Sequence, residues 1–380
     1  MKSSTERILT THVGSLPRSP AVARMLLQRE HDEHCDEALF SQTIRDAIIE
    51  VVKQQAETGI DIVSDGELSK IGYATYIKDR LSGFAGERAR KPALDLKDYP
   101  EYREKMTLIA GKQDFKRLCC SGPVALSDTS ALAFDLANFK AATANTPVTE
   151  AFMNSASPGL VSAFQPNAYY PDHSSYLYAI SQAMQYEYEA IVEAGFILQV
   201  DCPDLAMARH TGFQDLSERQ FLNQARQQVE ALNQALANIP AEKIRMHICW
   251  GNYEGPHTHD IALEKIVNII LQAKPSAILF EASNPRHAHE WRVWQEAKIP
   301  EHKILVPGVV DSTSNYVEHP ELVCQRICQF ADIVGRERVL AGTDCGFATF
   351  AGVGKVDPKI VWKKLGALVE GAAMASKKLY

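Results

Sequence analysis

Four side chains in the C-terminal half of the chain have the types and the placement of a zinc site. His247 and Cys249 lie two residues apart in the strand-like run 244–250, and a strand projects such residues to the same side. Two later apolar runs end at Glu281 and at Cys345. Burying a polar group at the end of an apolar strand costs free energy unless the group has a binding partner. Imidazole, thiolate and carboxylate are all zinc ligands, so zinc could be that partner. These four residues are therefore predicted to bind one zinc ion.

A zinc site of this composition suggests thiol chemistry. Two thiolates, one carboxylate and one imidazole suit zinc and disfavour magnesium or calcium, which prefer oxygen ligands. Such a site can hold an incoming thiol as its thiolate near neutral pH, whereas a free thiol has a pKa of about 8.5. The alternative is that His247 and Cys249 are ordinary core residues, since cysteine is often buried. The placement of all four residues at predicted strand ends favours the metal site.

Other polar side chains follow predicted strands and could bind the rest of a substrate. Asp65, Glu67 and Asp201 could hold an α-amino group or transfer protons, and the alternative is that they cap the following helices. Ser15 follows Gly14, and this pair could bind a carboxylate or only form a tight turn. Four histidines in the segments after the metal strands are expected to be solvated surface residues: His257, His259, His287 and His289.

The elements that must position these residues alternate between strands and helices along the whole chain. The eight predicted strand ends lie in residues 8–14, 60–65, 148–153, 197–201, 244–250, 277–284, 304–311 and 339–346. Helices are predicted at about 41–57, 174–194, 216–238, 260–273, 320–334 and 358–377. Such alternation indicates a parallel sheet, and eight units indicate closure into an α/β (β/α)8 TIM barrel. Residues 1–380 are predicted to form this single domain.

Two stretches interrupt the alternation. Residues 79–117 are polar, rich in Lys and Arg and poorly periodic, and they lead to a ninth strand candidate at 117–124. We predict an insertion after the second strand, over about 79–125, that forms a flap or hairpin on the active face. Residues 154–173 are rich in Ser, Pro, Asn and Tyr, and they are predicted to be a long loop on the same face.

Length and composition bound the class of protein. The chain has 380 residues, of which 46% are hydrophobic and 23% charged, which is typical of a globular protein with a large core. The formal net charge of −7 argues against nucleic acid or an anionic membrane as partner. No apolar run approaches the roughly 20 residues that span a bilayer, and the first residues lack the apolar core of a signal peptide. A cytoplasmic protein with reduced cysteines is expected, and its oligomeric state stays open.

Three motifs carry a resemblance to a known family. They are His247-x-Cys249, Glu281-x-Ser283-x-x-Arg286 and Asp344-Cys345-Gly346. These resemble the zinc motifs in the C-terminal catalytic barrel of cobalamin-independent methionine synthases. Further similarities to that family lie in Val13-Gly14-Ser15-Leu16-Pro17-Arg18, Asp65-Gly66-Glu67 and Val200-Asp201-Cys202-Pro203. The resemblance covers nearly the whole chain and extends to the family's short relatives, among them epoxyalkane:coenzyme M transferase.

The resemblance implies a zinc-dependent S-methyltransferase that converts homocysteine to methionine, an activity of methionine biosynthesis. It implies zinc on His247, Cys249, Glu281 and Cys345, and the amino-acid part of homocysteine on Ser15, Glu67 and Asp201. The methyl donor would be of the methyltetrahydrofolate type or another compound. Asp311 or Thr313 would orient this donor.

Two departures from the family pattern concern the donor side. Where the long enzymes have Asp-Ile-His-Ser-Pro-Arg, this chain has Asp311-Ser312-Thr313-Ser314-Asn315-Tyr316, so the histidine proposed to protonate the folate leaving group is missing. The loop 157–164 also lacks the tryptophan used against the pterin. The alternatives are alkylation of another thiol, as in epoxyalkane:coenzyme M transferase, or a non-catalytic barrel whose zinc is structural. Opening of an epoxide would need an acid for the alkoxide, and Tyr253, His257 and Tyr73 are candidates for it.

Overall fold

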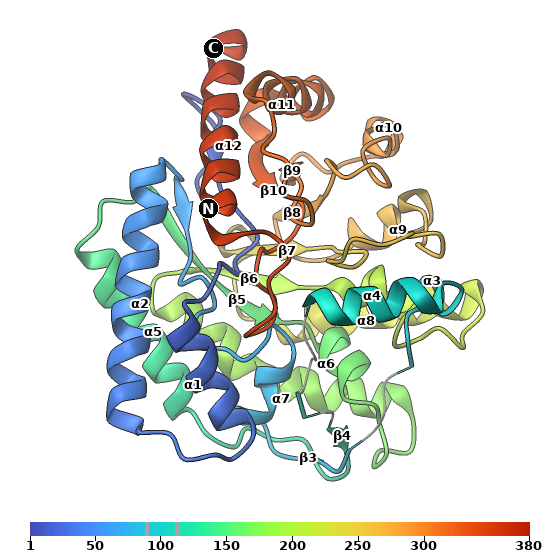
Figure 1. Ribbon diagram of the computed structural model, residues 1–380. Helices are drawn as coiled ribbons and strands as arrows, with labels where there is room; N and C mark the ends of the chain where they lie inside the picture. Colours follow the sequence, from blue (N-terminus) through green and yellow to red (C-terminus); the bar gives the residue numbers. More distant parts are fainter. Residues whose placement is uncertain (88–90, 111–114, 117) are drawn as a thin grey trace.

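The computed structural model describes residues 1–87, 91–110, 115–116 and 118–380, and its centre is a barrel of parallel strands (Figure 1). Eight of the described strands form one sheet in the order β1-β10-β9-β8-β7-β6-β5-β2. A parallel bridge between Thr11 and Ile62 joins the two outer strands. The sheet therefore closes on itself, and the predicted α/β TIM barrel is confirmed.

The barrel strands are short and each overlaps one predicted strand region. They are β1 (Leu9–Thr10), β2 (Ile62–Val63), β5 (Glu150–Ala156), β6 (Ile197–Asp201), β7 (Ile244–His247), β8 (Ala277–Glu281), β9 (Ile304–Val310) and β10 (Leu340–Thr343). The described helices are α1 (Pro20–Glu30), α2 (Glu37–Thr58), α3 (Leu94–Lys97), α4 (Pro100–Ala110), α5 (Ser130–Ala144), α6 (Pro158–Phe164), α7 (His173–Glu193), α8 (Glu218–Ala235), α9 (Leu263–Ile270), α10 (Trp291–Glu296), α11 (Pro320–Val334) and α12 (Pro358–Leu379).

The expectation of one long loop over 154–173 is wrong. Strand β5 continues to Ala156, and Pro158–Phe164 form the helix α6. Ser157 caps this helix, because its side chain accepts a hydrogen bond from the backbone N–H of Leu160, and Pro158 suits the first helical position. A serine followed by proline was the local signal for this helix.

The core has two parts, one between the strands and the surrounding helices and a smaller one inside the barrel. The inner cluster consists of Leu9, Val13, Ile62, Phe152, Ile197, Ala277, Leu279, Val306 and Leu340. Arg245 is fully buried beside it, and its guanidinium lies 3.5 Å from the centre of the Phe152 ring. Arg245 also donates hydrogen bonds to Gln199, Thr11 and the carbonyl of His12, so the charge at the barrel centre is surrounded by acceptors.

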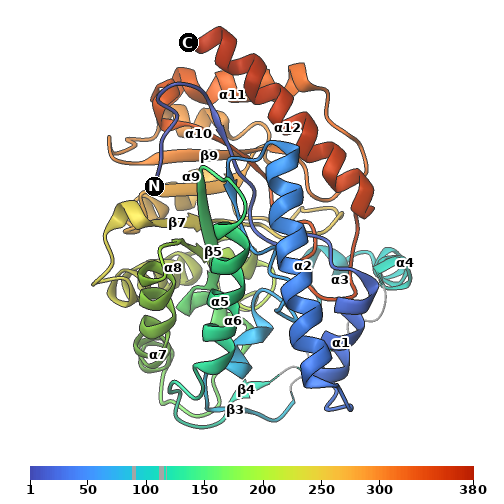
Figure 2. The same cartoon turned by 90° about the vertical axis from the view of Figure 1, so that its left-hand side faces the viewer.

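The segment between β2 and β5 extends outside the barrel. It contains a two-stranded antiparallel sheet, β3 (Phe84–Ala85) with β4 (Cys119–Cys120), and the helices α3 and α4. Figure 2 shows α3 and α4 on the side of the molecule opposite the N terminus. The predicted ninth strand begins at Arg117, which lies outside the described residues. The action of this segment as a flap stays a prediction.

Within the described chain, every helix is too short or too polar to cross a membrane.

Candidate active site

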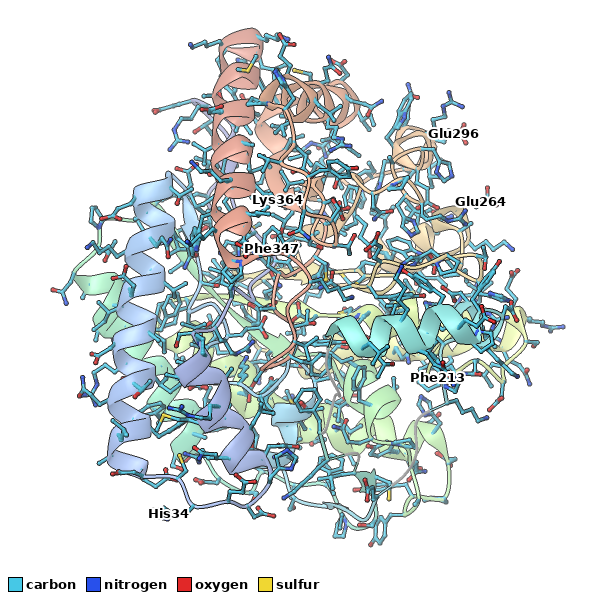
Figure 3. The ribbon with its side chains drawn as sticks, viewed as in Figure 1. His34, Phe213, Glu264, Glu296, Phe347 and Lys364 are labelled. Atoms are coloured by element: carbon cyan, nitrogen blue, oxygen red, sulfur yellow. The ribbon has the colours of Figure 1, made fainter. Side chains whose placement is uncertain are left out.

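A cavity of about 850 Å³ lies among the loops that follow the barrel strands. Six of the predicted site residues line it: Ser15, Glu67, Asp201, His247, Cys249 and Cys345. Its walls also include Arg103, Met106 and Thr107 of α4. Phe347, another lining residue, lies below α12 near the middle of the view in Figure 3. The barrel thus gathers these six residues from five strand ends, together with residues of the inserted segment, around one space.

The metal-binding atoms of His247, Cys249 and Cys345 form a compact group. All three side chains are buried, and their donor atoms lie within 4.8 Å of one another. The two sulfur atoms are 3.6 Å apart, close to the roughly 3.8 Å that separates two thiolates on one tetrahedral zinc ion. Strand β7 ends at His247, so Cys249 lies in the turn after the strand and not within it as predicted. This donor set fits zinc.

The protonation states of this group also fit a metal site. His247 Nε2 lies 3.1 Å from the carbonyl oxygen of Asp344, and burial lowers the pKa of His247 to about 4. The imidazole is therefore neutral at pH 7, as a metal ligand must be. The neighbouring Cys345 and burial raise the pKa of the Cys249 thiol well above its ordinary value. A thiolate at Cys249 needs a nearby cation, which zinc would provide.

Glu281 ends β8. Among the described residues, it does not belong to any group of three potential metal ligands whose donor atoms lie within 4.8 Å of one another. Its Oε1 accepts a hydrogen bond from the backbone N–H of Trp250 at 2.8 Å, and its Oε2 accepts one from Asn284 Nδ2 at 2.7 Å. Burial raises the pKa of this carboxyl group. The role of Glu281 as fourth ligand stays a prediction.

Asp344 joins the ends of β8 and β10, a role that sequence analysis did not assign. Its Oδ1 accepts hydrogen bonds from the backbone N–H groups of Ala282 and Ser283, and its Oδ2 accepts one from that of Asn284, each at 2.9 Å. These bonds hold Cys345, the next residue, against the strand end that carries Glu281. The sequence signal was only the position of Asp344 before the cysteine.

Two buried carboxylates line the same cavity, and one of them, Asp201, lies beside His247. Asp201 Oδ1 lies 3.7 Å from His247 Nδ1, and the carboxylate accepts hydrogen bonds from Asn154 at 3.0 Å and Gln199 at 2.8 Å. Glu67 Oε2 is buried without a hydrogen-bond partner among the described residues. Burial raises the pKa of both carboxyl groups against the opposing charge of Lys70, and the charge of Asp201 raises the pKa of Glu67 further. Such a pair is suited to bind a cation.

The backbone around Glu67 is shaped to present this side chain. Glu67 has a φ of 55°, a left-handed conformation that is uncommon outside glycine and often marks a functional position. Its N–H donates to Asp65 Oδ1 at 3.0 Å, and its carbonyl accepts a hydrogen bond from Arg18 at 2.7 Å. Asp65 therefore shapes this turn, and the alternative that it caps a following helix is wrong, because the next helical element begins only at Thr75.

Ser15 lies against the loop that carries Cys345. A Cβ atom on Gly346 would come within 2.0 Å of Ser15 Oγ, so only glycine allows this approach. The N–H of Phe347 donates to the carbonyl of Ser15 at 2.9 Å. The first and the last barrel strands thus bring a hydroxyl and a thiol to the same wall of the cavity.

Asp311 shapes a turn, and neither it nor Thr313 lines the cavity. The Asp311 carboxylate accepts hydrogen bonds from Thr313 N and Oγ1 at 3.0 and 2.8 Å and from Ser314 N at 2.9 Å. Ser312, between them, does line the cavity and donates to Asn252 Oδ1 at 3.2 Å. The assignment of Asp311 and Thr313 to the donor stays a prediction, and the geometry supports an indirect contribution through Ser312.

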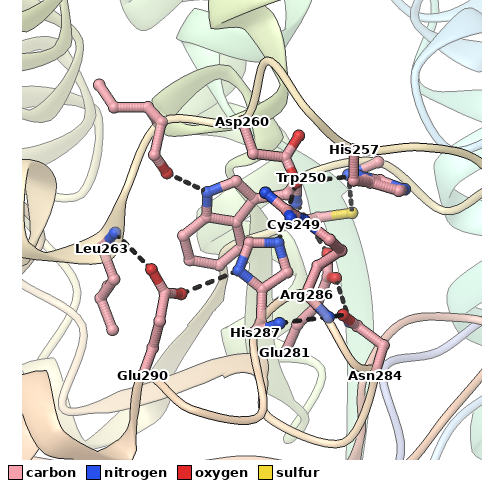
Figure 4. Close-up of polar contacts among 12 residues, drawn as sticks. Cys249, Trp250, His257, Asp260, Leu263, Glu281, Asn284, Arg286, His287 and Glu290 are labelled. Atoms are coloured by element: carbon pink, nitrogen blue, oxygen red, sulfur yellow. Dashed lines mark hydrogen bonds and ion pairs between the residues drawn. The ribbon is translucent and has the colours of Figure 1, made fainter. Parts of the chain in front are cut away.

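Two of the four histidines expected at the surface are buried, so that expectation is wrong for His257 and His287. Figure 4 shows both against Asp260, whose Oδ2 lies 2.9 Å from His257 Nδ1 and 3.0 Å from His287 Nε2. Burial acts to lower the pKa of His287, but its contacts with Asp260 and Glu290 outweigh burial and raise the pKa to about 10. Carboxylates therefore hold His287 as a cation, and contact with Asp260 also raises the pKa of His257 against the effect of burial.

Asp95 of α3 connects the inserted segment to the loop after β7. Its Oδ2 accepts hydrogen bonds from the Tyr253 hydroxyl and from the backbone N–H of His257, and its Oδ1 lies 3.1 Å from His210 Nδ1. Burial acts to raise the pKa of Asp95, but the contacts with His210 and Tyr253 lower it overall. Asp95 is therefore ionised and fixes α3 over the cavity.

Asp95→Asn is expected to loosen this attachment and to lower the free energy of unfolding by about 2 kcal/mol, because a charged acceptor of several hydrogen bonds is lost. Urea unfolding measures the stability, and hydrogen exchange of residues 91–110 measures the local opening. Asp98→Asn is the matched control, since Asp98 is 59% exposed on the same segment. Equal exchange in the two variants would show that Asp95 does not fasten the segment.

Comparisons with known proteins identify the family. The sequence model described as "Cobalamin-independent synthase, Catalytic domain" matches residues 8–95 and 117–370. The methionine synthase of Saccharolobus solfataricus is 26% identical over 385 residues, which cover 97% of this chain and 95% of that protein. The methionine synthase of Thermococcus kodakarensis is 24% identical and covers 97% of this chain and 94% of its own length.

Solved structures share the fold. A B12-independent methionine synthase from Shewanella sp. W3-18-1, in complex with selenomethionine, has a TM-score of 0.73 and 18% identity over 98% of this chain and 99% of its own. A putative vitamin-B12-independent methionine synthase from Listeria monocytogenes has a TM-score of 0.65 and 18% identity over 97% of this chain and 98% of its own. The family match extends over all the barrel strands and most of the residues that line the cavity, and this chain belongs to the cobalamin-independent synthase family, in its catalytic domain.

Proposed function

We propose that this protein is a zinc-dependent methyltransferase that transfers a methyl group from a methyltetrahydrofolate-type donor to the sulfur of homocysteine, forming methionine. The observation that carries the proposal is the 3.7 Å distance between Asp201 Oδ1 and His247 Nδ1. A place for an ammonium group and a place for a thiol-binding metal therefore adjoin on one cavity wall. This suits an acceptor in which only a few carbon atoms separate the thiol from the ammonium group, and the methionine synthases among the relatives support the same acceptor.

His247, Cys249 and Cys345 would hold the zinc ion, with Glu281 as the proposed fourth ligand. When bound, zinc supplies a Lewis acid that keeps the acceptor's sulfur in its thiolate form near neutral pH. The neutral imidazole of His247 offers a lone pair at pH 7, and Asp344 keeps Cys345 in position through its backbone hydrogen bonds.

The amino-acid part of homocysteine would be bound by Ser15, Glu67 and Asp201. An ammonium group between Glu67 and Asp201 would stabilise the ionised forms that burial now disfavours. The hydroxyl of Ser15 would donate to the substrate carboxylate. A sulfonated thiol without an ammonium group would leave Glu67 unpaired, so the two buried carboxylates favour an amino-acid thiol over the acceptor of the epoxyalkane transferases.

The test is zinc content together with X-ray absorption at the zinc edge, measured with and without homocysteine. We expect one zinc per chain, whose spectrum gains a sulfur neighbour when homocysteine is added. Homoserine, which has a hydroxyl in place of the thiol, is the matched control and is expected to leave the spectrum unchanged. If homocysteine also leaves the spectrum unchanged, the proposed acceptor is wrong.

A further inference from the structure

Methyl transfer from an amine nitrogen requires a proton donor, because the deprotonated amine is a poor leaving group. The identity of this proton donor rests on the proposed function, in which the methyl group leaves a folate-type nitrogen. Two candidates from the sequence are held in other contacts: the Tyr253 hydroxyl donates to Asp95, and both ring nitrogens of His257 are engaged, with Asp260 and with the carbonyl of Tyr253. His257 is also absent from the lining of the cavity.

Lys355 is a cavity residue that sequence analysis did not single out. It follows β10 in the loop before α12, and it lines the same space as Cys249 and Cys345. Its Nζ donates a hydrogen bond to the carbonyl of Asn252, in the turn after β7. The side chain of Asn252 in turn donates to the carbonyl of Gly346 at 2.7 Å. The amine is thereby fixed between the two loops that carry the metal-binding thiols.

The surroundings of Lys355 make its ammonium group a ready proton donor. Burial lowers its pKa to about 8, while Cys345, Cys249, Glu254 and Asp311 act in the opposite direction through their charges. Among the described residues, none of these carboxylates forms an ion pair with it. The ring of Tyr253 also faces the amine, and its centre lies 5.7 Å from Nζ. A pKa close to the working pH is the property that a general acid needs.

We propose that Lys355 is the general acid that protonates the leaving nitrogen of the methyl donor. The thiolate of homocysteine forms a bond to the methyl carbon, and the bond between that carbon and the donor nitrogen breaks. The electron pair of the broken bond stays on the nitrogen, which takes a proton from Lys355 Nζ. The neutral amine then regains a proton from water, which balances the proton that the thiol of homocysteine lost on binding.

Two variants separate proton transfer from the other contributions of this side chain. Lys355→Gln keeps a hydrogen-bond donor for the carbonyl of Asn252, but its amide group is not acidic enough to transfer a proton. Lys355→Arg keeps the positive charge, but its guanidinium does not lose a proton in proteins. The zinc-loaded protein and both variants are assayed with homocysteine and two donors, methyltetrahydrofolate and methyl iodide. Methyl iodide is the matched probe, because iodide leaves without a proton.

With methyltetrahydrofolate, we expect both variants to lose about 10²- to 10⁴-fold in kcat, the usual contribution of a general acid. With methyl iodide, their rates are expected to stay within about threefold of the unmodified protein. Zinc content and the calorimetric affinity for homocysteine are expected to be unchanged. The kcat of the unmodified protein should fall above about pH 8 with the folate donor only, as the ammonium group loses its proton.

Each other outcome has a distinct meaning. Full activity of Lys355→Gln with methyltetrahydrofolate overturns the role of Lys355, and a parallel loss in Tyr73→Phe would assign the proton to Tyr73. Recovery in Lys355→Arg, or an equal loss with both donors, shows that the charge of Lys355 matters and not its proton. If the unmodified protein methylates homocysteine with neither donor, the proposed function itself is wrong. If the unmodified protein uses methyl iodide but not methyltetrahydrofolate, the proposed folate donor is wrong. The reaction then needs no acid, and the role of Lys355 is overturned.

Discussion

Replacing Cys249 by serine is expected to remove most of the bound zinc and to lower kcat/KM for homocysteine by more than about 100-fold. Loss of a residue that only orients a metal ligand typically costs about 10- to 100-fold, and loss of the ligand itself should exceed this range. The Cys249 sulfur lies 3.6 Å from that of Cys345 in the metal-binding group, and a serine hydroxyl there does not supply a thiolate. Elemental analysis gives the zinc content, and steady-state kinetics gives kcat/KM.

Cys328→Ser is the matched control for this experiment. Cys328 is a half-buried free thiol on α11 and is not among the residues that line the cavity. Its replacement is expected to leave the zinc content and kcat/KM within about twofold of the unmodified protein, as is usual for a substitution away from a site. If Cys249→Ser retained full zinc and full activity, the metal-binding group would have no part in the reaction.

Replacing Glu67 by glutamine is expected to lower kcat/KM for homocysteine by about 100-fold, because one partner of a buried charge pair is lost. The amide has nearly the shape of the carboxylate, but it cannot neutralise an ammonium group. Glu67 Oε2 makes no hydrogen bond to any other described residue, so the substitution breaks no internal contact of that atom. Kinetics with homocysteine over a range of concentrations measures the effect.

The matched substrate is 4-mercaptobutanoate, which is homocysteine without its ammonium group. The unmodified protein should use it poorly, because Glu67 would stay buried without a partner. In Glu67→Gln this penalty is smaller, so the preference for homocysteine should shrink by about the same 100-fold. An unchanged preference between the two thiols would mean that Glu67 does not bind the ammonium group and that the acceptor is held in another way.

The sequence determined the barrel and the convergence of the three residues proposed to bind the metal. Periodic strands and helices must bury their apolar faces in a parallel sheet, and parallel strands deliver their ends to one rim. His247 ends such a strand, and Cys249 and Cys345 lie two residues beyond strand ends, so their convergence could be predicted from order alone. The same rule brought Ser15, Glu67 and Asp201 to the cavity, whereas Asp65 neither lines the cavity nor caps a helix and instead shapes the turn before Glu67.

Residues outside the strand ends could not be placed in this way. His257 and His287 belong to polar loops and were expected in solvent, yet they are buried against Asp260. Asp95 and Lys355 lie in segments without periodicity, about 260 residues apart in the chain, and both reach the loop after β7. No local pattern encodes these contacts, because they depend on how separate loops pack over the rim.

The sequence by itself determined which residues can reach the cavity, and only the tertiary structure decided what each of them contacts there. The positions of strands and helices along the chain follow from local hydrophobic periodicity, which can be recognised in a single sequence. Hydrogen bonds such as those of Asp344 to the end of β8 join residues that are about 60 positions apart. Protonation depends on burial and on such neighbours, as for His247 and Lys355. The protonation states of the site residues therefore follow from the tertiary structure and not from the sequence alone.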